Sequence, residues 1–128
     1  MENAGTKEKH KILYAEDQES IARLVQFKLE KEGFEIIILT DGNNVVQTAV
    51  EQKPSLILLD IMLPIKDGIT ILEELKSNDA VKNIPVIMLS VQGDEQKILK
   101  ALNSGAVDYI QKPFSTAELT SRIRKALA

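Results

Sequence analysis

Five short apolar segments alternate along this chain with five amphipathic segments, and this alternation is the feature that most restricts its fold. The apolar segments, at 11–15, 34–39, 56–59, 85–90 and 107–111, read as β-strands. Strict alternation of strands and helices is typical of βαβ units, which build a parallel sheet. Right-handed crossovers place helices on both faces of such a sheet. We therefore expect an α/β fold with a doubly wound, five-stranded parallel sheet of order 2-1-3-4-5.

The segments between these strands carry apolar residues at helical spacing. The expected helices cover 19–32, 43–52, 69–77 and 94–103, and a last one follows Ser115. Ser115 and Glu118 form a capping box at the start of that helix, and Gly33 suits the end of the first. The faces predicted to point inward include Ile21, Leu24, Val25 and Leu29 in the first helix and Ile98, Leu99 and Leu102 in the fourth.

Length and composition indicate one folded domain. The chain has 128 residues, of which 44% are hydrophobic and 27% charged, so it can bury a core and is not a disordered chain. Residues 1–9 are polar and unpatterned, which predicts a flexible tail before a domain over 10–128. No apolar run approaches the ~20 residues of a membrane span, and the N-terminal segment lacks the apolar core of a signal peptide. The expected location is the cytoplasm, with no membrane partner.

Missing residue types exclude several kinds of site. With no cysteine there is no thiolate zinc site, iron–sulfur cluster or cysteine nucleophile. A single histidine, His10, excludes a metal site built from several histidines and a Ser-His-Asp triad deep in the fold. The formal charge of −3 argues against direct binding of nucleic acid.

Reactive or charged side chains stand at the ends of four expected strands. Glu16 and Asp17 follow the first, Asp60 the third, Ser90 the fourth and Lys112 the fifth. In an open parallel sheet the carboxyl ends of the strands lie at one edge, which is where ligands bind. We therefore expect these side chains to gather in one crevice.

Their chemistry is that of phosphoryl transfer. Carboxylates that share a crevice repel one another, and an all-oxygen ligand set favours a hard cation, Mg²⁺ or Mn²⁺. Asp60 would attack phosphorus and become an aspartyl phosphate. The cation, the Lys112 ammonium and the Ser90 hydroxyl would bind the phosphoryl oxygens, on which the charge of the transition state lies.

The segments ILYAEDQE, LILLDIMLPIKDG, IPVIMLS and GAVDYIQKPFS, in this order, carry a resemblance. From His10 to Leu127 the chain resembles the receiver domain of bacterial response regulators, a flavodoxin-like (βα)5 fold. The resemblance implies that Asp60 is the phosphoacceptor and that Asp17 binds Mg²⁺ directly. It also implies that Glu16 acts through water and that the Met62 carbonyl completes the protein's share of the metal ligands.

The resemblance assigns the remaining positions as well. Ser90 would be the switch hydroxyl, Tyr109 the switch aromatic, and Lys112 the lysine that contacts the phosphate, joined to Pro113 by a cis peptide bond. The expected partner is a sensor histidine kinase or a phosphotransfer protein. The surface formed by the fourth helix, fifth strand and fifth helix would switch and could form a homodimer. Asp108 and Arg122 could then form ion pairs between subunits, joined by Lys97 or Lys100.

Two departures from the family pattern affect the site. The first acid is Glu16 where the family usually has Asp, so the water around the metal could shift. Val91 follows Ser90 where a small residue is common. A β-branched side chain there would shield the phosphoryl group from water, so we expect slow self-dephosphorylation.

Two alternatives remain open at this point. A pseudo-receiver is an interaction module that is never phosphorylated, although it typically lacks one of the acidic pair, the acceptor and the lysine. A haloacid-dehalogenase-type phosphatase also forms an aspartyl phosphate, but it needs a second acid two residues after the nucleophile, where this chain has Met62. We therefore expect a signalling phosphoacceptor, which catalyses only its own phosphorylation and dephosphorylation, rather than an enzyme.

Overall fold

The computed structural model describes residues 9–91, 93 and 95–128. In these residues five strands alternate with five helices, in the order β1 (Lys11–Ala15), α1 (Glu19–Lys31), β2 (Glu35–Leu39), α2 (Val45–Gln52), β3 (Leu56–Asp60), α3 (Gly68–Lys76), β4 (Val86–Val91), α4 (Glu95–Asn103), β5 (Asp108–Lys112) and α5 (Thr116–Leu127). The strands form one parallel sheet of order β2-β1-β3-β4-β5, so the predicted fold class is confirmed. The expected tail at 1–9 lies outside the described residues, except for Lys9, which is exposed.

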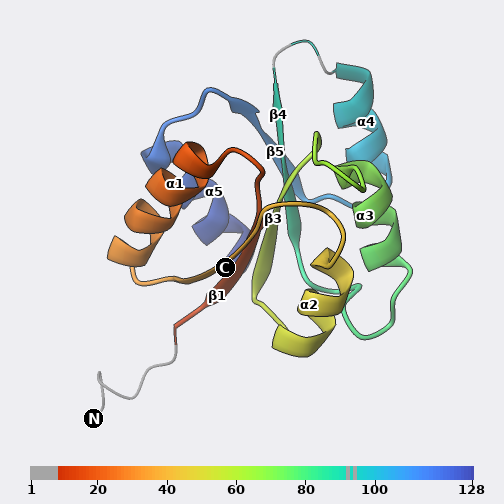
Figure 1. Cartoon of the computed structure of the whole chain (residues 1–128), viewed down its shortest axis with the longest axis horizontal. Coiled ribbons are helices and arrows are strands. Elements are labelled where there is room, and N and C mark those ends of the chain that lie inside the picture. The colour runs from red at the N-terminus through yellow and green to blue at the C-terminus, as the bar shows by residue number, and fades with distance from the viewer. Residues whose placement is uncertain (1–8, 92, 94) are drawn as a thin grey trace.

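The sheet is the middle of three layers. Helices α1 and α5 cover one face, and α2, α3 and α4 cover the other (Figure 1). Successive side chains of a strand point to opposite faces, so each strand contributes to both cores. Leu13, Ile57 and Met88 pack with α2, α3 and α4, whereas Ile12, Leu58 and Leu89 pack with α1 and α5. All five residues of β3 are buried, as expected for the central strand of a parallel sheet.

The parallel register brings the carboxyl ends of the strands to one edge. Ala15 of β1 pairs with Leu59 of β3, and Asp60 is next to Leu89 of β4. Val91 of β4 in turn pairs with Lys112, the last residue of β5. The residues that follow β1, β3, β4 and β5 therefore meet at this edge.

The ends of the helices follow local sequence signals. Gly33, just after α1, has a φ of 97°, which glycine adopts without the steric cost of a side chain. At the start of α5 the Ser115 hydroxyl accepts a 3.0 Å hydrogen bond from the Glu118 amide, as the capping pattern predicts.

The longest described helix, α1, has 13 residues. No helix in the described part of the chain has the length and apolar character for a bilayer crossing.

Two residues predicted to face the core lie on the surface instead. Leu24 of α1 is 54% exposed and Leu99 of α4 is 60% exposed, so the prediction was wrong for both. Alanines at neighbouring positions, Ala22 and Ala101, are buried in their place. These small side chains allow the helix backbones to pack close to the sheet, which turns the larger leucines outward.

Candidate functional site

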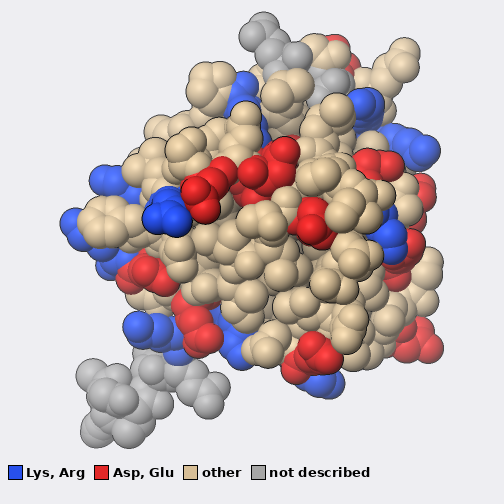
Figure 2. Space-filling view, in the orientation of Figure 1, with Lys and Arg blue, Asp and Glu red and all other residues tan. Residues whose placement is uncertain are grey.

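Three carboxylates meet at the carboxyl edge of the sheet. One carboxylate oxygen each from Glu16, Asp17 and Asp60 lies within 4.8 Å of the others. Glu16 directly follows β1, and its amide donates a 2.9 Å hydrogen bond to the Leu39 carbonyl, which extends the pairing with β2. Glu16 and Asp60 are buried, whereas Asp17 is exposed. Figure 2 shows acidic side chains in the upper part of the visible face, toward the end of the sheet where this cluster lies.

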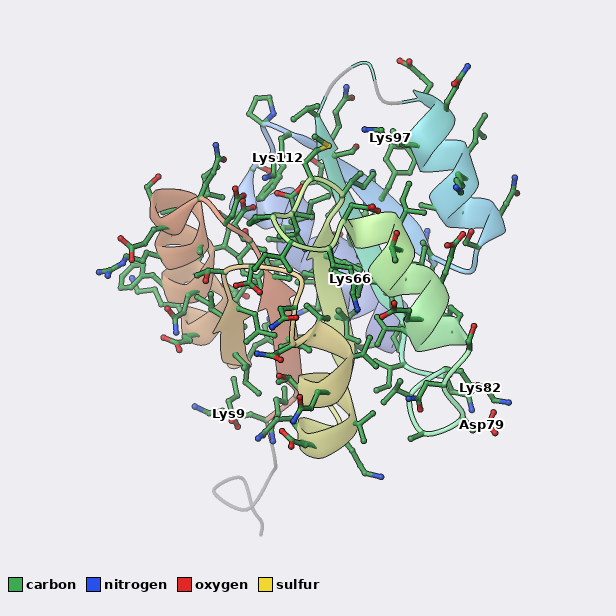
Figure 3. All side chains as sticks on the ribbon, turned by 45° about the vertical axis from the view of Figure 1, so that its right-hand side comes forward. Lys9, Lys66, Asp79, Lys82, Lys97 and Lys112 are labelled. Atoms are coloured by element: carbon green, nitrogen blue, oxygen red, sulfur yellow. The ribbon has the colours of Figure 1, made fainter. Side chains whose placement is uncertain are left out.

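Lys112 balances part of this charge. Its Nζ donates 2.8 Å hydrogen bonds to Glu16 Oε1 and Asp60 Oδ2, and its side chain is only 14% exposed. Burial alone would lower the pKa of Lys112, but the hydrogen bonds and negative charge of Asp60 and Glu16 outweigh it and raise the pKa. The ammonium is therefore charged at neutral pH. Figure 3 shows Lys112 at this end of the molecule, and the peptide bond from Lys112 to Pro113 is cis.

The main chain closely surrounds Asp60. Its Oδ1 accepts a 3.0 Å hydrogen bond from the Met62 amide, which leaves Oδ2 to Lys112. Gly68, the first residue of α3, lies so close that an added Cβ would overlap the Asp60 carbonyl oxygen. Asp67 caps this helix by accepting 3.0 Å hydrogen bonds from the amides of Ile69 and Thr70. Asp67 and Gly68 thus begin α3 directly against Asp60.

Glu16 has two further donors besides Lys112. The Tyr14 hydroxyl lies 3.2 Å from Glu16 Oε1, and the Gln18 amide lies 3.2 Å from Oε2. Burial, followed by the charge of Glu16, raises the pKa of Tyr14, so its phenol stays neutral and donates. Sequence reasoning missed Tyr14 as a site residue. The signal was available, since residues two apart on a strand share a face of the sheet.

Among the described residues, Ser90 and Tyr109 take no part in the hydrogen bonds of this cluster. Ser90 is buried, and its hydroxyl has no hydrogen-bond partner among the residues that the structure describes. By alternation along the strands, Ser90 and Tyr109 belong to the face covered by α4, whereas Glu16, Asp60 and Lys112 belong to the face covered by α1 and α5. The Tyr109 side chain is partly exposed at the surface.

Apolar side chains surround the cluster on the outside. A groove of about 390 Å³ next to Lys112 is lined largely by Ile21, Leu24, Val91 and Phe114. Val91 is 48% exposed, so its isopropyl group stands at the border between the site and solvent. In the loop between β3 and α3, Ile65 is 75% exposed and has a φ of 74°, a conformation that is strained for a β-branched residue.

Asp108 and Arg122 are paired within one chain. Arg122 Nη1 lies 2.8 Å from Asp108 Oδ1 and 3.0 Å from Oδ2. The hydrogen bond and charge of Asp108 raise the pKa of Arg122. The resemblance suggested ion pairs between subunits for these residues, whereas here each satisfies the other inside the same molecule.

The donor set fits a hard divalent cation. Glu16, Asp17 and Asp60 offer only oxygen atoms, the ligands that Mg²⁺ prefers, and Asp17 is exposed toward solvent. With Lys112 charged, the three carboxylates leave a formal charge of −2 in the cluster, which one divalent ion would balance. Asp17 and Asp60 could supply direct ligands, since Glu16 is already held by protein donors.

Comparisons with known proteins agree with this geometry. The family described as "Response regulator receiver domain" matches residues 12–124. The alkaline phosphatase synthesis transcriptional regulatory protein PhoP of Bacillus subtilis (strain 168) is 38% identical over 117 residues, which cover 91% of this chain. Those residues cover 48% of that protein, so this chain spans about half the length of the curated relative.

Solved structures show the same fold. The crystal structure of a putative response regulator from Chloroflexus aurantiacus J-10-fl matches with a TM-score of 0.89 and 28% identity, over 94% of this chain and 98% of that one. The receiver domain of sensor histidine kinase PA1611 from Pseudomonas aeruginosa PAO1, described with a magnesium ion coordinated in its active site cleft, matches with a TM-score of 0.86 and 27% identity, over 94% and 98% of the two chains. The chain belongs to the response regulator receiver domain family, the signalling domain of two-component systems.

Proposed function

We propose that this receiver domain accepts a phosphoryl group on Asp60 from the phosphohistidine of a sensor histidine kinase or a phosphotransfer protein. The observation that supports this most strongly is the bridge from Lys112 Nζ to Asp60 Oδ2 at 2.8 Å, beside Glu16 and Asp17. A carboxylate next to a charged ammonium and further metal-binding acids has the surroundings that phosphoryl transfer requires. The proposed compartment is the cytoplasm.

In this proposal an Asp60 carboxylate oxygen attacks phosphorus while the bond from phosphorus to the partner's histidine nitrogen breaks. The electron pair of that bond remains on the imidazole. The Met62 amide holds Oδ1 and thereby orients the carboxylate. The Lys112 ammonium, which contacts Oδ2 in this structure, would contact an oxygen of the phosphoryl group formed on the same carboxylate.

Mg²⁺, for which Mn²⁺ could substitute, would stabilise the negative charge of the transferred group. Asp17, Asp60 and the Met62 carbonyl would bind it, with Glu16 acting through a water molecule. The magnesium described for the Pseudomonas receiver supports this assignment. The same residues would promote loss of the phosphoryl group to water, so the domain would catalyse only its own phosphorylation and dephosphorylation.

The proposed response involves Ser90, Tyr109 and the surface of α4, β5 and α5. The Ser90 hydroxyl, buried without a partner in the described structure, would bind a phosphoryl oxygen, and Tyr109 would turn inward behind it. Exposed Leu99 and Val107 on this surface support a homodimer or an output partner there. The net charge of −3 supports a chain that does not itself bind nucleic acid.

The test is the intact mass of the protein after incubation with Mg²⁺ and acetyl phosphate. We expect one added phosphoryl group, which is absent in Asp60→Asn and absent when EDTA removes the metal. Sedimentation with and without beryllofluoride then tests the homodimer. A protein that gains no phosphoryl group and binds no beryllofluoride would be a pseudo-receiver. The phosphatase alternative has no support from the family comparison.

A further inference from the structure

The Tyr14 hydroxyl lies directly beneath the acidic cluster. Tyr14 is fully buried in β1, on the face that packs against α1 and α5. Its Oη lies 3.2 Å from Glu16 Oε1, the same oxygen that accepts the 2.8 Å hydrogen bond from Lys112 Nζ. A single carboxylate oxygen therefore connects a hydroxyl of the core with the ammonium beside Asp60.

Protein donors occupy most of the Glu16 carboxylate. An ionised carboxylate has about four acceptor positions, and Tyr14, Lys112 and the Gln18 amide use three of them. The remaining position can accept a hydrogen bond from water, but the side chain is not free to turn toward a metal. The Tyr14 contact thus favours a water-mediated role for Glu16.

The contact with Tyr14 depends on the length of the Glu16 side chain. At 3.2 Å it is already long for a hydrogen bond between a hydroxyl and a carboxylate. An aspartate at this position would be one methylene shorter, so its carboxylate would lie closer to the strand backbone. The same hydroxyl would then be out of reach unless the strand moved.

We propose that Tyr14 is a positioning residue, whose hydroxyl holds Glu16 where it can bind a water of the metal ion and anchor Lys112 against Asp60. The inference rests on the proposed Mg²⁺-dependent phosphoacceptor and assigns a role to a residue in the core. Loss of a hydrogen-bond partner behind a metal ligand typically lowers affinity about 10- to 100-fold. Because the Tyr14 contact is long and Glu16 keeps two other donors, we expect a smaller loss.

The experiment is a double-mutant cycle read out as Mg²⁺ affinity by titration calorimetry. Tyr14→Phe removes only the hydroxyl, and we expect it to weaken Mg²⁺ binding about threefold to tenfold. In the Glu16→Asp background the contact is already lost, so the same change should have an effect below about 1.5-fold. Thr120→Val is the matched control, because it removes a buried hydroxyl whose one hydrogen bond among the described residues is donated to the Thr116 carbonyl of α5 at 2.9 Å.

The outcomes separate this role from the proposed function. If the wild type binds Mg²⁺ and is phosphorylated on Asp60, but Tyr14→Phe has no effect or the same effect in both backgrounds, the positioning role is wrong and the function stands. If the wild type binds no Mg²⁺, the proposed function fails and the role of Tyr14 fails with it.

A second measurement uses only proteins that keep Tyr14. Tyrosine labelled with ¹³C at Cζ gives two signals, one for each tyrosine of the chain. We expect Mg²⁺ to shift the Tyr14 signal more in the wild type than in Glu16→Asp. Among the described residues the hydrogen bond from the hydroxyl reaches the metal site through Glu16, whereas the charge of Asp60 acts on Tyr14 through space in both proteins. An equal response in both proteins would overturn the proposal even if Tyr14→Phe does not fold.

Discussion

The Lys112 ammonium lies 2.8 Å from Asp60 Oδ2 and equally close to Glu16 Oε1, so one cation from the edge strand β5 connects the carboxylates at the ends of β1 and β3. This bridge spans the sheet because all three strands are parallel and end at the same edge. It neutralises one of the three negative charges and leaves the rest for a divalent ion. The resting protein therefore holds Lys112 where phosphoryl transfer would need it.

Removal of the Lys112 ammonium should make the stability of the fold depend on Mg²⁺. Lys112→Met leaves Glu16 and Asp60 buried without their counter-charge, so we expect the free energy of unfolding to fall by about 3 kcal/mol, the lower end for a broken buried pair. Mg²⁺ should restore part of the loss and should raise the melting temperature more in Lys112→Met than in the wild type. Thermal unfolding with Mg²⁺ or EDTA measures this. An equal Mg²⁺ shift in both proteins would contradict the balance of charges described here.

Val91 should slow the loss of the phosphoryl group. Its isopropyl group stands at the solvent side of the site, so Val91→Ala should open a path for water. We expect self-dephosphorylation about threefold faster, a change in the barrier of about 0.7 kcal/mol. The measurement is the decay of the phosphorylated protein by intact mass. Leu24→Ala, in the same groove, is the control, and an unchanged or slower rate in Val91→Ala would refute the shielding role.

Ile65 should destabilise the loop that follows Asp60. A β-branched residue with a φ of 74° is strained, and the side chain is 75% exposed, so little burial is lost on its removal. Ile65→Gly should raise the free energy of unfolding by about 1 kcal/mol, after the greater freedom of glycine in the unfolded chain is counted. Ile65→Ala keeps a Cβ, so its free energy of unfolding should rise much less. Urea unfolding compares the three proteins, and equal stability of the two variants would rule out strain as the cause.

Asp67 should make stability depend on pH in the acid range. The hydrogen bond from the Thr70 amide is the main cause that lowers the pKa of Asp67 in the folded protein from its ordinary value of 3.8. Hydrogen bonds from the Thr70 hydroxyl and the Ile69 amide act in the same direction, and partial burial opposes them. A lowered pKa in the folded state means that the contribution is present above the unfolded pKa and is lost as pH falls through the folded one. We expect Asp67→Ala to cost about 1 kcal/mol at pH 7.

Asp67→Asn separates the charge of this cap from its hydrogen bonds. An asparagine side chain still accepts hydrogen bonds from the amides at the helix N-terminus. The free energy of unfolding of Asp67→Asn should therefore be closer to that of the wild type at pH 7, and it should vary less between pH 5 and pH 3. Urea unfolding over this range tests the sign. A gap between wild type and Asp67→Asn that widens as pH falls would contradict the lowered pKa.

The position of the site could be predicted from the sequence because the ends of strands can be found without tertiary information. Apolar runs ending in Asp60, Ser90 and Lys112 mark the points where buried backbone meets solvent, and parallel pairing brings these points together. The order of the strands came from the size of the chain and from family resemblance. These are global patterns, which survive small shifts of individual side chains.

What the sequence could not predict depends on local fit. Helical periodicity identifies a face but does not decide whether Ala22 or Leu24 points to the sheet. The contact from Tyr14 to Glu16 depends on one methylene of side-chain length. The φ of Ile65 is set by how the loop joins β3 to α3, a tertiary constraint that no local residue pattern shows.

The close contact between Gly68 and the Asp60 carbonyl should hold Asp60 more rigidly on the side of α3 than on the side of β4. No side chain separates the start of α3 from the Asp60 backbone, so movement of Asp60 in that direction would be opposed by a helix that the Asp67 cap holds in place. On the side of β4, the buried Ser90 hydroxyl makes no hydrogen bond to any described residue, so no hydrogen bond would have to break for this side chain to move. A displacement that starts at Asp60 would then be transmitted across the sheet toward β4 and β5, so the proposed switch would act in one direction rather than equally on all sides.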